Sequence, residues 1–138
     1  MALADHPLFR KLARLDLPTE HYVIAGSAPM LAHSIKREIH DLDIVAREGA
    51  WEKAATLGEI VQAPYSSAKV IYLCDGKIEI LDRWFQWGAS DLIRTAEMIE
   101  GLPFVPLRIT VDWKRKLGRP EDKRDIEVIE RFLAQDYS

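Results

Sequence analysis

Short apolar runs, separated by turn-forming residues, divide the first third of the chain into strands and a helix. Tyr22–Ala25 and Leu42–Ala46 are rich in β-branched and aromatic residues and are predicted to be buried strands. Between them, Gly26 and Ser27 break the first run, and Pro29 stands where the first turn of a helix tolerates proline. The segment is therefore predicted to form a strand, a tight turn, a short helix and a second strand.

A hairpin is predicted in the middle of the chain. Val70–Cys74 and Lys77–Leu81 are apolar runs on either side of Asp75 and Gly76. An Asp-Gly pair between such runs favours a type I′ turn, because both central positions of that turn need a positive φ.

Apolar stripes at helical spacing and short apolar runs predict the remaining elements. A first helix is capped by Asp5 and has Leu8, Leu12 and Leu15 on its buried side; a second, over Trp51–Leu57, follows a loop at Arg47–Ala50 and is closed by Gly58. A third covers Leu92–Met98. A fourth is capped by Thr110 and ends at Gly118, and a fifth starts at Pro120 and buries Ile126, Ile129 and Leu133. Short strands are predicted at Glu59–Gln62 and at Phe104–Leu107, the second at a sheet edge because a proline interrupts it.

Length and composition limit the number of domains, the class of protein and its expected cellular location. The 138 residues suit one domain with a real core, and the 30% charged and 48% hydrophobic fractions are those of a globular protein. No apolar run approaches the roughly 20 residues of a membrane span, and Cys74 has no second cysteine to pair with. We therefore predict a single cytoplasmic α/β (α+β) domain over residues 1–138, with a small mixed sheet, helices on one face and an open second face. A net charge of −3 argues against a surface built to coat nucleic acid.

Two carboxylates at the start of the second strand carry the first chemical signal. Asp41 and Asp43 share one face, because side chains alternate along a strand, while Leu42 points the other way. Neighbouring carboxylates repel and raise each other's pKa unless a cation lies between them, and Mg²⁺ prefers oxygen ligands. The turn at Gly26 and Ser27 adds backbone N–H groups that attract phosphate. Each feature alone is common, but together they predict phosphoryl or nucleotidyl transfer.

This order of residues resembles the core of polymerase-β-type nucleotidyltransferases, and most of all the small bacterial branch with toxin–antitoxin and antibiotic-modifying members. His33, Arg37, Asp41 and Asp43 fall where that branch has its His, its Arg and its two metal-binding Asp. The resemblance implies an α/β fold, transfer of a nucleotide from a nucleoside triphosphate, two Mg²⁺ ions, and nucleotide contacts from Arg37.

Two positions depart from the pattern of the branch. Ser34 follows the His where Gly is usual, and Ile39 stands where Thr is usual. Neither departure touches the carboxylates.

A third carboxylate on a neighbouring strand completes the metal site in this superfamily, and Glu79 and Asp82 both lie near the expected place. Strand alternation favours Glu79, because Asp82 falls in line with Ile78 and Ile80, which are predicted to face the core. Glu79 falls on the face of the two aspartates, although Asp is commoner than Glu there. The alternative is a surface Glu79 paired with Lys77.

A second motif lies near the C-terminus. Lys114, Arg119, Asp122 and Asp125 follow the pattern Lys-x4-Arg-x2-Asp-x2-Asp, which resembles the end of the domain in the same branch. Lys114 and Arg119 are expected to face the triphosphate, since Arg suits bidentate phosphate contacts. Asp122 and Asp125 are expected to orient these cations. The alternative is a solvated basic surface.

An aromatic cluster follows the predicted hairpin. Trp84, Phe85 and Trp87 lie within four positions of one another. We favour the wall of a core or cleft over a platform that stacks on a base.

These observations predict Mg²⁺-dependent transfer of a nucleotide to an acceptor hydroxyl, with catalytic and metal-binding roles for Asp41, Asp43 and Glu79. Gly26 and Ser27 would hold the triphosphate. The acceptor, whether a small molecule, a protein or a tRNA, is left open, and a homodimer or a protein partner is compatible with the sequence. The alternative is a non-catalytic module that binds a nucleotide or a protein, such as the regulatory part of a toxin–antitoxin pair.

Overall fold

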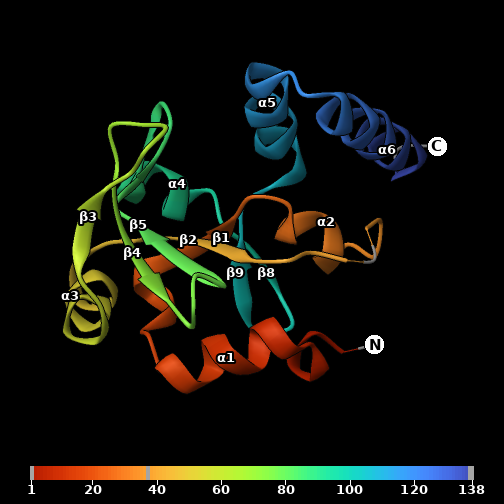
Figure 1. Cartoon of the computed structure of the whole chain (residues 1–138). Helices are drawn as coiled ribbons and strands as arrows, with labels where there is room; N and C mark the ends of the chain where they lie inside the picture. Colours follow the sequence, from red (N-terminus) through yellow and green to blue (C-terminus); the bar gives the residue numbers. More distant parts are fainter. Residues whose placement is uncertain (1, 37, 137–138) are drawn as a thin grey trace.

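A seven-stranded mixed sheet organises the chain (Figure 1). The structure, a computed structural model, describes residues 2–36 and 38–136. The strands lie in the order β3-β4-β5-β2-β1-β9-β8. Their bounds are β1 Tyr22–Ala25, β2 Leu42–Ala46, β3 Ile60–Gln62, β4 Lys69–Leu73, β5 Ile78–Leu81, β8 Glu97–Ile99 and β9 Leu102–Phe104. Two further strands, β6 Arg83–Trp84 and β7 Trp87–Gly88, form a small sheet of their own.

Helices lie on both sides of this sheet. Their bounds are α1 Pro7–Leu15, α2 Ala28–Ala32, α3 Glu48–Leu57, α4 Ala89–Arg94, α5 Leu107–Leu117 and α6 Pro120–Asp136, with single 3-10 turns at Leu3–Asp5 and Thr19–His21. In Figure 1, α1 lies on one side of the sheet, and α5 and α6 lie on the other. No helix in residues 2–36 and 38–136 is long and apolar enough to cross a membrane.

The central strands β1, β2 and β5 hold the sheet together. β2 pairs antiparallel with β1 and parallel with β5. Strands that are paired on both edges and covered on both faces need nearly continuous apolar runs, and all four residues of β1 are buried. On one face, Ile24, Ile44 and Ile80 pack against apolar side chains of α1 and α3.

The second face of the sheet is covered in part. Val23, Val45 and Leu81 pack there against side chains that include Trp84 and Leu92, from β6 and α4. α5 contributes to the same cluster. The expectation of helices on one face is therefore incomplete, and the uncovered remainder of the second face is where the acidic residues lie.

α5 and α6 form the C-terminal part of the fold. Gly118 ends α5 with a φ of 63°, a left-handed conformation that glycine adopts without strain. Ile129 of α6 is fully buried against Met30, Leu107 and Val111, so α6 packs on both α5 and α2. The predicted helix from Pro120 with its buried stripe is confirmed.

The central hairpin has a longer turn than predicted. Strand pairing ends at Leu73 and resumes at Ile78, so residues 74–77 form the connection. Positive φ values of 55° at Cys74, 57° at Asp75 and 81° at Gly76 span three positions. The predicted reversal at Asp75 and Gly76 is present, because both residues have a positive φ and the Lys77 N–H donates to the Cys74 carbonyl at 3.0 Å. The prediction missed only the length of the connection, since strand pairing stops one residue earlier on each side.

Several predicted boundaries are also wrong. The His6 side chain, and not Asp5, caps α1 by accepting from the Leu8 N–H. α3 begins at Glu48, and α5 begins at Leu107, so Thr110 lies inside α5, where its hydroxyl donates to the Pro106 carbonyl. The run Leu92–Met98 divides into α4 and β8, and β9 lies inside the sheet because β8 covers its outer edge.

Candidate active site

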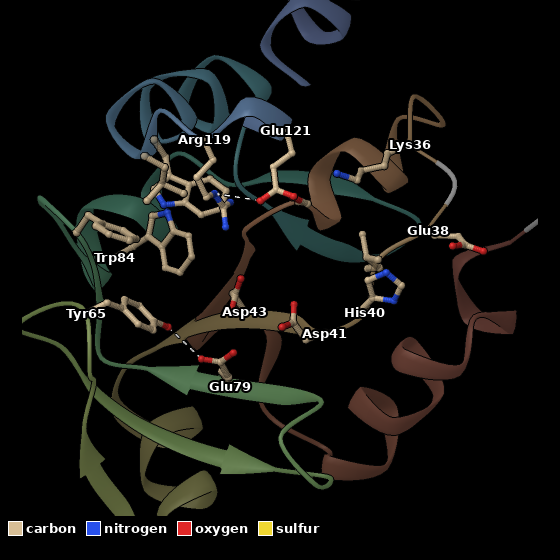
Figure 2. Close-up of a pocket in the computed structure, with 15 residues that line it drawn as sticks. Lys36, Glu38, His40, Asp41, Asp43, Tyr65, Glu79, Trp84, Arg119 and Glu121 are labelled. Atoms are coloured by element: carbon tan, nitrogen blue, oxygen red, sulfur yellow. Dashed lines mark hydrogen bonds and ion pairs between the residues drawn. The ribbon is translucent and has the colours of Figure 1, made fainter. Parts of the chain in front are cut away.

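A pocket of about 650 Å³ opens above the uncovered part of the second sheet face (Figure 2). One side of its wall is charged and the other is aromatic. Among the described residues, it is lined by Ser27, Lys36, Glu38, Ile39, His40, Asp41, Asp43, Tyr65, Glu79, Trp84, Phe85, Trp113, Leu117, Arg119 and Glu121. The sequence had drawn attention to Ser27, Asp41, Asp43, Glu79 and Arg119, and to the aromatic residues Trp84 and Phe85.

Among the described residues, three of the five carboxylates that line the pocket lie on or next to two adjacent strands. Asp43 of β2 lies directly opposite Glu79 of β5 in the parallel register, and Asp41 immediately precedes β2 (Figure 2). Burial, followed by the charges of Asp41 and Glu79, raises the pKa of Asp43 well above its usual value, although the Lys114 charge opposes this. Burial and the Asp41 charge also raise the pKa of Glu79. The predicted alternation along both strands is therefore correct.

The Gly26 turn touches this acidic group. Gly26 has a φ of +68°, and a Cβ atom placed on it would come within 2.4 Å of the Asp43 Oδ2 atom. Any side chain here would displace the Asp43 carboxylate, so glycine is required for two separate reasons. The turn and the carboxylate thus lie in direct contact, as a phosphate cradle beside a cation site would require.

Lys114 lies behind the pocket lining, where it contacts Ser27 and Trp113. Its side chain is 1% exposed, and its ammonium donates to the Ser27 hydroxyl at 3.0 Å. The same ammonium lies 2.9 Å from Asp125 and 3.5 Å from Asp122. The structure therefore places Lys114 behind the turn, where it fixes Ser27, and not on the pocket surface where the sequence analysis expected it.

Arg119 does face the pocket. Its side chain is half exposed, and it donates to Asp122 from Nε at 2.7 Å and from a terminal nitrogen at 3.0 Å. Burial alone would raise the pKa of Asp122. The hydrogen bonds from Arg119 and the charge of Lys114 have a larger effect in the opposite direction, so the pKa of Asp122 is lowered. Asp125 behaves alike, because Lys114 and Lys36 both donate to it. The prediction that the two aspartates orient cations agrees with these contacts.

Two other residues named from the sequence, His33 and Asp82, lie elsewhere. His33 is 2.8 Å from Glu97 and packs against Phe132, outside the pocket lining. Asp82 accepts a hydrogen bond from the Lys69 N–H at 2.9 Å and is absent from the lining as well. Arg37 lies outside the described residues.

The aromatic side of the pocket is built from residues far apart in the sequence. Trp84 packs against Phe85 and Trp113, with ring centroids 5.1 and 4.9 Å apart, and Tyr65 stacks on Phe85 at 6.3 Å with an interplanar angle of 22°. The prediction of a wall holds for Trp84 and Phe85. Tyr65 was missed, because it lies in an irregular loop with no periodic signal.

Tyr65 also contacts the acidic group. Its hydroxyl donates to Glu79 at 3.0 Å (Figure 2). Partial burial, and then the charges of Glu79 and Asp43, raise the pKa of Tyr65 above its ordinary range. The charges of Glu79 and Asp43 therefore act directly on the Tyr65 hydroxyl.

The donor set of the pocket suits Mg²⁺. Asp41, Asp43 and Glu79 offer only oxygen ligands, and the raised pKa of Asp43 marks a group that a cation would stabilise. Within residues 2–36 and 38–136, however, no three acidic, His or Cys side chains are already arranged to share one ion.

Comparison with known proteins supports the fold. No family model matches the sequence, and no curated protein matches it. A solved structure that matches is the crystal structure of a candidate nucleotidyltransferase from Thermotoga maritima, with a TM-score of 0.58 and 21% identity over 97% of this chain and 99% of that chain. The chain therefore has, over nearly its whole length, the mixed α/β fold of that Thermotoga maritima protein, in agreement with the fold that the sequence resemblance implied.

Proposed function

We propose that this protein transfers a nucleotide from a nucleoside triphosphate to an acceptor hydroxyl with the help of Mg²⁺. The observation that carries the proposal is the register of β2 and β5, which sets Asp43 opposite Glu79 while Gly26 touches Asp43. Nucleotidyl transfer needs a phosphate-binding turn next to carboxylates that hold a metal ion, and the Gly26 turn lies next to Asp43 in this way.

Each residue group has a role in the proposal. Asp41, Asp43 and Glu79 would hold the metal, and when bound, Mg²⁺ would neutralise charge on the reacting phosphate oxygens. The backbone N–H groups at Gly26 and Ser27 would bind phosphate. Arg119 lines the pocket with its guanidinium already oriented by Asp122. Arg37 is a further nucleotide contact that rests on the sequence resemblance alone.

Glu79 is also the candidate general base. It lines the pocket beside the aromatic wall and already accepts a hydrogen bond from the Tyr65 hydroxyl. A base must lie within hydrogen-bond reach of the proton that it removes. The proposal leaves open whether the acceptor is a small molecule, a protein or a tRNA.

The test is transfer of label from α-labelled nucleoside triphosphates to components of a lysate, with Glu79→Gln compared with Asp82→Asn. Glu79→Gln should lower the rate by about 10²–10⁴-fold, the usual contribution of a general base, with little change in melting temperature. Asp82→Asn should leave the rate nearly unchanged, because Asp82 bonds to the Lys69 N–H outside the pocket lining. The reverse pattern would reject the assignment of Glu79.

A non-catalytic nucleotide- or protein-binding role, such as the regulatory part of a toxin–antitoxin pair, is the second candidate. It is favoured by the engagement of Glu79 with Tyr65 and by the lack of a ready three-ligand group among the described residues. This role predicts that Mg²⁺ and nucleotide raise the melting temperature while no label is transferred. Capture of a second copy or of a protein partner would support it further.

A further inference from the structure

We propose that Tyr65 is an acceptor in cis, so that the chain transfers a nucleoside monophosphate to its own Tyr65 hydroxyl. This inference rests on the proposed function. It names a modification site that lies inside the pocket, and it identifies a phenolic hydroxyl as the class of acceptor that the site takes.

Two hydroxyl-bearing side chains line the described part of the pocket, and they have different partners. Of the described residues that line it, Ser27 and Tyr65 have hydroxyl groups. The Ser27 hydroxyl is held by the buried ammonium of Lys114, next to the turn that is proposed to bind phosphate. The Tyr65 hydroxyl instead donates to Glu79 at 3.0 Å, on the side of the proposed base. An acceptor hydroxyl has to occupy that place.

The contact between Tyr65 and Glu79 is supported by neighbouring structure. The Tyr65 ring stacks on Phe85, which itself packs against Trp84 and Trp113. The loop that carries Tyr65 is closed by a hydrogen bond from the Ala63 N–H to the Ala68 carbonyl and by the Ser66 hydroxyl, which accepts from the Ala68 N–H. These contacts hold the loop and the ring in the orientation that brings the hydroxyl to Glu79.

Tyr65 also remains open to solvent on its outer side. The residue is 53% exposed, although its hydroxyl is engaged inside the pocket. A nucleotide attached to the hydroxyl can therefore leave the pocket by a movement of this surface loop, without opening the core.

Tyr72 provides an internal comparison. It is 42% exposed and lies opposite Glu79 in the antiparallel register of β4 and β5. It is absent from the pocket lining, and its hydroxyl makes no hydrogen bond with the described residues. Two tyrosines therefore lie near the same carboxylate, and one of them has the contact that transfer requires.

The chemical step balances with the substrate already proposed. The Tyr65 Oη atom forms a bond to the α-phosphorus of the nucleoside triphosphate, and the bond from that phosphorus to the oxygen of the leaving pyrophosphate breaks. The phenolic proton passes to the Glu79 carboxylate. No oxidant or reductant is needed, and the products are a tyrosyl nucleoside monophosphate and pyrophosphate.

The experiment incubates the full chain with Mg²⁺ and each of the four common nucleoside triphosphates in turn, then measures intact mass and maps the modified peptide. We expect one nucleoside monophosphate on Tyr65 in the parent chain and in Tyr72→Phe. We expect none in Tyr65→Phe or in Asp43→Ala. Melting temperatures check that all variants are folded, and the peptide map of the parent identifies the residue without any variant.

A mixing experiment tests that the transfer occurs in cis. Asp43→Ala protein, made distinguishable by a tag, is incubated with the parent chain and nucleotide. Label on the parent chain alone, at a fractional rate that does not change on dilution, supports the proposal. Label on the tagged Asp43→Ala chain would overturn the cis geometry.

Failure of this inference differs from failure of the proposed function. An unmodified parent chain that still labels components of a lysate would overturn the role of Tyr65 and leave the transferase proposal standing. Modification at another residue would overturn it as well. A chain that neither modifies itself nor labels any other molecule would overturn both proposals.

Discussion

Replacing Lys114 by methionine tests the charge network behind the candidate site. Lys114 is 1% exposed and supplies its ammonium to Asp122, Asp125 and the Ser27 hydroxyl. Methionine preserves most of the volume of the side chain and removes its charge. The variant therefore isolates the electrostatic contribution of the buried ammonium from its packing.

The magnitude follows from the partners that remain. Removing one member of a buried ion pair costs about 3–5 kcal/mol, because the other charge is left in an apolar environment. Asp122 keeps the Arg119 guanidinium at 2.7 Å, and Asp125 keeps Lys36 at 2.9 Å. We therefore expect the lower end, about 3 kcal/mol, which in a domain of this size corresponds to a fall in melting temperature of roughly 12 °C.

The loss of stability should depend on pH. The pKa values of Asp122 and Asp125 are lowered in the folded chain, because the hydrogen bonds and charges of Arg119, Lys114 and Lys36 outweigh burial. A carboxyl group with a lowered folded pKa stabilises the protein above its unfolded pKa, and this contribution is lost as the pH falls through the folded pKa. The difference between parent and variant should thus be largest near pH 7 and shrink in acid.

Thermal melting from pH 3 to pH 8 measures this difference. A second substitution, Asp125→Asn, in the Lys114→Met background removes a carboxylate charge that has lost one of its two cations among the described residues, and it should restore part of the melting temperature. A Lys114→Met protein that melts within 2–3 °C of the parent at pH 7, less than about 1 kcal/mol, would refute the reasoning. A loss of stability that stays constant with pH would refute it equally.

Three further substitutions test the pocket itself. Asp43→Asn should raise the melting temperature at pH 7 without metal, because burial and the neighbouring carboxylates raise the Asp43 pKa. This gain should vanish below about pH 4, where aspartate is protonated in the folded and in the unfolded chain. If Mg²⁺ and nucleotide stabilise the variant as fully as the parent, the metal assignment is contradicted. Arg119→Ala should weaken triphosphate binding by about tenfold in titration calorimetry, because one charged hydrogen bond is lost. It should also reduce the rise in affinity from mono- to triphosphate. Equal losses of affinity for nucleoside and triphosphate would instead indicate a packing role. Gly26→Ala should cost about 1–2 kcal/mol for its left-handed backbone, should displace the Asp43 carboxylate, and should abolish stabilisation by Mg²⁺ and nucleotide. Gly76→Ala, with a φ of +81° and no atom within 4 Å of the added Cβ, should show the backbone cost alone in melting experiments and keep that stabilisation.

The strand-level part of the site could be predicted from the sequence. Alternation of side chains set Asp43 on one face and Ile44 on the other, and the same rule chose Glu79 over Asp82. These predictions hold because both strands lie in the centre of the sheet, where a shift of one residue would bury a carboxylate. The boundaries of α3 and α5 were less accurate, because helix ends depend on tertiary contacts as well as on local caps.

Lys114 and Tyr65 show what the sequence alone could not decide. A lysine in a basic run looks the same whether it is solvated or buried, and its burial depends on the packing of Asp122 and Asp125 from the next helix. Tyr65 approaches Glu79 across 14 positions of chain, by way of a loop and a stack on Phe85. Neither arrangement leaves a periodic pattern.

The site depends on acidic residues of α6 that follow it in the sequence. The three carboxylates and the Gly26 turn are all synthesised before Gly118, but the acids that neutralise Lys114 follow it, in α6. A ribosome-bound chain that has not yet released α6, or a fragment cut at the exposed Gly118, leaves the ammonium behind Ser27 without those acids. One proteolytic cut far from the carboxylates, followed by loss of α6, would therefore remove part of the support behind the Gly26 turn.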